Sequence, residues 1–81
     1  MNKPWVRFHL NESIGELQKV IEAIDGRTSF STEEFEIAIA HAYHHLNTAW
    51  NSRSISDQEA REHTDWDYST WRQFPTDLNL S

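Results

Sequence analysis

The sequence predicts an all-α fold: an antiparallel helical hairpin, preceded by an extended arm and followed by one or two short helices rich in tryptophan. Two observations predict the hairpin. Apolar residues recur at helical spacing over about 11–25 and again over about 32–51, and a short loop separates the two stretches. The length of 81 residues also suits one domain near the lower size limit for a hydrophobic core. We therefore expect residues 1–81 to form a single small helical domain.

The first helix is predicted by one apolar stripe over about 11–25. The members of this stripe recur at steps of three and four: Leu10, Ile14, Leu17, Ile21 and Ile24. Asn11 suits the N-cap, and Gly26 follows the last apolar position, where a left-handed residue commonly ends a helix. We expect the stripe to pack against the second helix.

The second helix begins with the clearest local signal in the sequence. Ser31 and Glu34 have the spacing of a capping box, while Phe30 and Phe35 have that of a hydrophobic staple. The apolar stripe that follows consists of Phe35, Ala38, Ile39, Ala42, Leu46, Ala49 and Trp50. If Leu46 is central to the hairpin, its replacement by alanine should cost about 2–5 kcal/mol.

The segment before the first helix alternates apolar and polar side chains. Val6, Phe8 and Leu10 would share one face of an extended chain, but no second strand pattern follows to pair with it. Three interpretations remain: an extended arm, a strand that pairs across a dimer, and a continuation of the following helix. Pro4 would suit the first turn of such a longer helix. We favour the extended arm.

The C-terminal third predicts short helices rich in aromatic residues. Ile55, Ser56 and Glu59 repeat the pattern of staple and capping box, which predicts a helix ending near His63. A last helical stretch ends at Pro75. Its aromatic residues are Trp66, Tyr68, Trp71 and Phe74. In a domain of this size we expect these aromatic rings to cover the hairpin.

Three closely spaced histidines on the second helix are candidates for a metal site. They are His41, His44 and His45. His41 and His45 lie one turn apart and could share a zinc ion if His63, or a nearby acid, folded back as a further ligand. The alternative is a structural role, in which an imidazole beside the apolar stripe is half-buried and hydrogen-bonded. We favour the structural role and expect no cofactor.

Two groups of residues are candidate partner-binding surfaces. The first group lies away from the apolar stripe of the second helix and consists of Ile37, His41 and His44. The second group is aromatic and consists of Trp66, Tyr68 and Trp71, since Trp and Tyr are enriched at interface hot spots. For the first group, the alternatives are cover by the C-terminal aromatic residues or by a second subunit.

Composition argues against several classes of function. Thirteen acidic residues against seven basic ones give a net charge of −6, which disfavours direct binding to nucleic acid. Cysteine is absent, so disulfides and thiolate metal sites are excluded. No run of apolar residues suits a signal peptide or a membrane span, and we expect a cytoplasmic protein. The two glycines form no phosphate loop or nucleophile elbow, and we do not expect an enzyme.

These observations favour a small acidic protein-interaction module. Its partner would be another protein or a second copy of the chain, since symmetric pairs are the commonest oligomers. One alternative is a histidine-based site for a metal or small ligand at His41, His45 and His63. The other alternative is an acidic inhibitor that imitates nucleic acid through the carboxylates of the C-terminal third.

Overall fold

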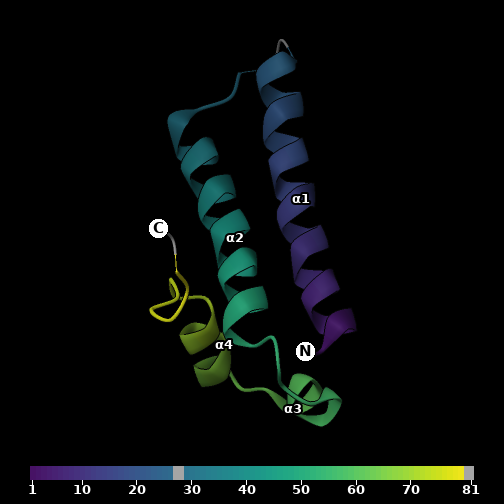
Figure 1. The fold of residues 1–81 in the computed structure, drawn as a ribbon. Helices are drawn as coiled ribbons and strands as arrows, with labels where there is room; N and C mark the ends of the chain where they lie inside the picture. The colour runs from purple at the N-terminus through teal and green to yellow at the C-terminus, as the bar shows by residue number, and fades with distance from the viewer. Residues whose placement is uncertain (27–28, 80–81) are drawn as a thin grey trace.

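The computed structural model describes residues 1–26 and 29–79, which form four helices and no strand. The helices are α1 (Lys3–Asp25), α2 (Thr32–Asn51), α3 (Asp57–Glu62) and α4 (Asp65–Trp71). Figure 1 shows α1 and α2 antiparallel and side by side, with α4 beside α2 on the side away from α1. The predicted hairpin with short C-terminal helices is therefore confirmed. Residues 27–28, which follow Gly26, and residues 80–81 lie outside the described range.

The prediction of an extended N-terminal arm is wrong, because α1 begins at Lys3. The side chain of Asn2 caps the helix by accepting a hydrogen bond from the Trp5 backbone amide at 3.3 Å, and Pro4 lies in the first turn. The Trp5 indole donates to Ser52 Oγ at 2.7 Å, which fixes this first turn against the end of α2. Asn11, the predicted cap, lies inside the helix.

The ends of the two long helices test the predicted caps. Gly26 has φ −72° and ψ 163°, so the left-handed conformation predicted for it is wrong and the chain leaves α1 extended. At the start of α2, Ser31 Oγ accepts a hydrogen bond from the Glu34 amide at 3.1 Å, which confirms this cap. The Phe30 and Phe35 rings meet edge to face with centroids 6.4 Å apart, as the staple predicts.

Both short helices begin with reciprocal capping boxes. In α3, Ser56 and Glu59 each bond the backbone amide of the other, as predicted. In α4, Thr64 and Asp67 do the same, a box that the sequence analysis did not single out. These caps place helix starts at positions where the chain has little apolar surface to bury.

Two asparagines of α2 hold the segment that leaves α4. Asn51 Nδ2 donates to the backbone carbonyls of Trp71 at 2.7 Å and Gln73 at 2.6 Å. Asn47, which is buried, donates to the Arg72 carbonyl at 3.0 Å. Carbonyl groups at the end of a helix have no partner within that helix, so side-chain donors satisfy them here. The second half of α2 is thereby tied to α4.

Replacing Asn51 with alanine is expected to lower the free energy of unfolding by about 1–3 kcal/mol, because two hydrogen bonds to backbone carbonyls are lost. Urea denaturation followed by circular dichroism measures this loss. Gln58→Ala is the matched control, since the Gln58 amide donates to Glu62 on the surface. An equal effect of both substitutions would contradict a fastening role for Asn51.

The contact between α1 and α2 is formed by small and polar side chains, among them Ala42 and Ala49 of the predicted α2 stripe. Among the described residues, the buried hydrophobic side chains are Val20, Ala42 and Ala49. Ser13 is buried with them and donates to the Ala42 carbonyl at 2.8 Å. Such small side chains let two helix backbones approach closely. The large apolar side chains of the stripes therefore flank the line of contact.

The prediction that these stripes form the core is confirmed for Ala42 and Ala49 and wrong for most of the large apolar side chains. Phe35 is 42% exposed and Leu46 is 49% exposed. All five stripe residues of α1 are also exposed: Leu10, Ile14, Leu17, Ile21 and Ile24. Spacing showed which residues share a side of each helix, but the side that meets the neighbouring helix is set by shape and hydrogen bonding.

Candidate functional site

The two apolar stripes lie along the same side of the hairpin and form one open apolar surface. We call it the open face and define it by Leu10, Ile14, Leu17, Ile21 and Ile24 of α1 and Phe35, Ile39, Tyr43 and Leu46 of α2. Leu17 lines a shallow hollow together with Ile39, Tyr43 and Leu46. Leu10 lines an adjoining hollow with the same Tyr43 and Leu46. Helical periodicity places the remaining α1 members beside Leu10 and Leu17.

The C-terminal segment covers only the end of the open face nearest the N-terminus of α1. Phe74, Pro75 and Leu78 line the hollow that contains Leu10 and Trp50. The Trp50 indole donates to Asp77 at 2.9 Å. Arg53 stacks over the Trp50 ring at 3.9 Å, and its guanidinium lies 3.7 Å from the Asp77 carboxylate. These contacts hold the segment in place and leave the rest of the face uncovered.

Few charges line the hollows of the open face. The side chains that line its hollows include one acid, Glu36, and two bases, Arg53 and Arg72. None of the three lines the central hollow of Leu17 and Leu46. An apolar surface of this kind, with no charged residue in its central hollow, is typical of an interaction site.

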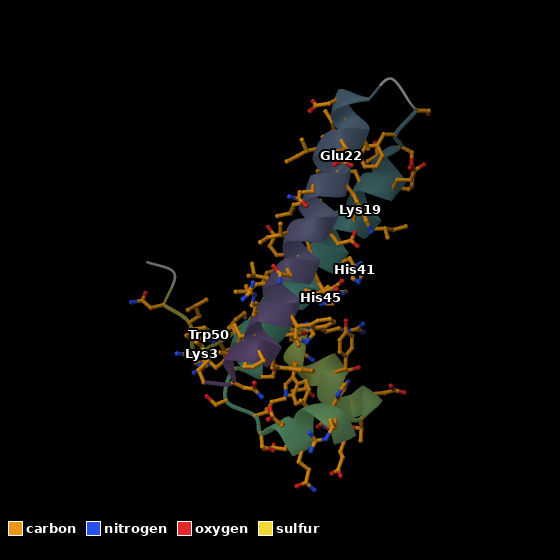
Figure 2. The ribbon with its side chains drawn as sticks, turned by 90° about the vertical axis from the view of Figure 1, so that its right-hand side faces the viewer. Lys3, Lys19, Glu22, His41, His45 and Trp50 are labelled. Carbon is orange, nitrogen blue, oxygen red and sulfur yellow. The ribbon has the colours of Figure 1, made fainter. Side chains whose placement is uncertain are left out.

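A chain of histidines runs along the opposite edge of the hairpin. Figure 2 shows His41 and His45 together on one edge, and Trp50 on the other edge beside the C-terminal segment. His9 Nδ1 lies 2.9 Å from His45 Nδ1, and His45 Nε2 lies 3.2 Å from His41 Nε2. His41 Nδ1 in turn lies 3.2 Å from a carboxylate oxygen of Glu16.

One set of neutral tautomers satisfies this chain. When His41 Nδ1–H donates to Glu16, His41 Nε2 is left to accept from His45 Nε2–H. His45 Nδ1 then accepts from His9 Nδ1–H. Within residues 1–26 and 29–79, His9 Nε2 is the buried side-chain polar atom left without a hydrogen-bond partner. His9 is 3% exposed, so this lone pair is in a dry environment.

Two members of the histidine chain, His9 and His45, are held neutral by their surroundings. Burial, reinforced by the nearby His45 and His63, lowers the pKa of His9 to about 4. Burial also lowers the pKa of His45, with a further lowering from His41 that the carboxylates of α1 partly oppose. The pKa of His44 is lowered by burial, then by Arg72 and His41. Neutral imidazoles preserve the hydrogen bonds between the rings, and these bonds support a structural role.

The proposed metal ligands are only partly brought together. His41 and His45 are neighbours, but their ring nitrogens face each other. His63 lies at the end of α3, where its Nδ1–H donates to the Ala60 carbonyl at 2.7 Å and its ring lies beside Trp5. Over the described part of the chain, no three side chains of histidine, cysteine, aspartate or glutamate are placed to hold a metal ion.

The predicted partner-binding residues are separated rather than gathered into one surface. Ile37 is 71% exposed and Trp66 is 78% exposed. The expected cover of Ile37 by the C-terminal aromatic residues is therefore not formed. The expectation that aromatic rings cover the hairpin is also wrong for Trp66. Trp71 is partly buried against Trp5 and the His63 ring. His44 and Tyr68 are partly buried too, whereas His41 is exposed.

The open face was not predicted as a surface, because the same residues were expected in the core. A second stripe on α1 carried the relevant signal: His9, Ser13 and Val20 recur at steps of four and seven. These residues mark the side of α1 that packs on α2. An apolar stripe displaced from this packing line is left on the surface.

Comparisons with protein family models, with curated proteins and with solved structures found no match to this chain. No helix among residues 1–26 and 29–79 has both the length and the apolar character needed to cross a bilayer. The site must therefore be interpreted from its own geometry.

Proposed function

We propose that this chain is a protein-interaction module without catalytic activity, and that it binds its partner through the open face. The observation that carries the proposal is the exposure of large apolar side chains on both long helices along one side of the hairpin. Because these side chains are about half exposed, each forgoes only roughly half of the about 1.5–3 kcal/mol that full burial contributes. A partner that covers the face recovers this free energy.

The geometry favours a helical partner. The open face is a shallow groove between two antiparallel helices, and Leu17 and Leu46 line it from opposite sides. A helix with its own apolar stripe fits such a groove, with side chains spaced at three and four residues. We place this module in the cytoplasm, as the sequence led us to expect.

The two alternative functions receive less support. A metal or small-ligand site at His41 and His45 would have to break the hydrogen bond between their rings. For imitation of nucleic acid, carboxylates would need to point outward in a cluster, yet Glu59 and Asp67 bond their own helix starts. Asp57 also accepts a hydrogen bond from Asn2. We therefore base the proposal on the open face.

Site-specific photo-crosslinking in the native cell tests this proposal. A benzophenone amino acid is placed at Leu17, on the open face, and as a control at Glu22, which is exposed elsewhere on α1. We expect a discrete protein adduct from Leu17 and none from Glu22, because only the first position contacts the partner. Equal adducts from both positions, or none from Leu17, would contradict the proposed site.

A further inference from the structure

We propose that the occupant of the open face is a second copy of this chain, so that two hairpins pack face to face as a four-helix bundle. The inference rests on the proposed function and adds the identity of the partner. Each hairpin is one layer of two antiparallel helices (Figure 1), and a four-helix bundle consists of two such layers around a shared core. The open face supplies the residues of that core.

The exposed area of the chain matches what a stable dimer needs to bury. A compact monomer of 9.6 kDa exposes about 5,100 Å², whereas this chain exposes 6280 Å². The excess of roughly 1,200 Å² exceeds the about 800 Å² that each partner contributes to a standard interface. The radius of gyration of 14.4 Å likewise exceeds the about 12 Å expected for a compact domain of 81 residues.

The composition of the core also favours a second copy over a foreign partner. Val20, Ala42 and Ala49 are small side chains, and they are the buried hydrophobic residues of the described chain. A domain of this size needs further apolar burial to remain folded. The molecule that covers the open face must then be present whenever the chain is present. A second copy of the chain meets this condition without depending on another protein.

The distribution of charge permits the chain to meet itself despite a net charge of −6. A two-fold interface brings the same patch against itself, so like charges within the patch would repel each other. The central hollow contains no charged side chain, and Glu36 and Arg72 lie together at one margin. The other acids of α1 and α2 lie outside these hollows, where solvent screens them.

Sedimentation equilibrium of the purified chain tests the inference. We expect twice the chain mass of 9.6 kDa at micromolar concentration, and a thermal midpoint that rises with protein concentration. Leu17→Glu and Leu46→Glu each place a charge in the central hollow and should raise the dissociation constant roughly 100-fold. Ile37→Glu makes the same change of charge off the open face and should leave the wild-type mass unchanged.

Every result separates the alternatives. A wild-type dimer that Ile37→Glu disrupts and Leu17→Glu does not would overturn the inference, because the interface would lie on the histidine edge. If the wild-type chain is a folded monomer, the inference of a second copy is overturned. The proposed function still stands in that case if a dye for apolar surfaces binds the wild type and does not bind Leu46→Glu. A folded monomer that binds no dye would overturn both. If a variant fails to fold, the thermal midpoint of the wild type is used instead. A midpoint that rises with protein concentration supports the dimer, and a constant midpoint overturns it.

Discussion

Acidification from pH 7 to pH 4 is expected to lower the free energy of unfolding by about 3 kcal/mol through His9 alone. Burial holds the pKa of His9 at about 4 in the folded chain, against an ordinary value of 6.5. Between these two values the unfolded chain binds a proton that the folded chain does not. The contribution of His9 to the free energy of unfolding is therefore fully present above pH 6.5 and is lost as the pH falls toward 4.

Other groups contribute to this dependence. The pKa of His45 is also lowered, so protonation of His45 in acid further lowers the free energy of unfolding. Glu12 and Glu16 favour the charged form of His45 and make this further loss smaller. Protonation of His45 would also remove the acceptor that His9 needs at 2.9 Å. Because His63 faces His9 from the end of α3, its charge opposes protonation of His9. Protonation of His45 in acid should consequently break the hydrogen bond between the His9 and His45 rings.

Urea denaturation at a series of pH values measures this prediction. In His9→Asn, the amide keeps a donor near the position of Nδ1 but cannot titrate, so the loss between pH 6.5 and 4 should shrink by about 3 kcal/mol. His63→Gln, at an exposed position, is the control and should keep most of the dependence. An unchanged slope in His9→Asn would refute the assignment to His9.

Leu46→Ala is expected to cost about 2–5 kcal/mol at protein concentrations where the open face is covered. In an isolated hairpin, Leu46 is 49% exposed, so its truncation should cost only about half as much. The size of the effect should therefore rise with protein concentration. The physical reason is that, in the proposed dimer, the second layer would cover the half of this side chain that the hairpin leaves exposed.

Global fits of urea denaturation at low and high protein concentration provide the measurement. Ile37→Ala is the matched control, because Ile37 is exposed on the other edge of α2 and should cost less than about 0.5 kcal/mol at any concentration. A cost for Leu46→Ala below about 1 kcal/mol throughout would show that nothing covers this position.

Much of the local structure could be predicted from the sequence because its causes lie within a few residues of each other. Ser31 and Phe30 set the start of α2, and Ser56 with Glu59 sets that of α3. The bounds of α2 were predicted correctly for the same reason. The N-terminal segment was not, because its alternation fits a helix as well as a strand over so few residues. Distant Ser52, which receives the Trp5 indole, anchors the helical form.

The candidate site depended more strongly on tertiary structure. Periodicity identified the apolar stripe on each long helix, and the charge balance and absence of cysteine limited the classes of function. Neither could reveal which side of α1 meets α2. The fit of Ser13 against the Ala42 carbonyl and of His9 against His45 decides that rotation, over sequence separations of about 30 residues or more. By itself, the sequence determined two amphipathic helices and the starts of α2 and α3. The tertiary structure decided that most of the large apolar side chains of the two long helices face outward, because small and hydrogen-bonded side chains such as Ala42 and Ser13 pack these helices against each other.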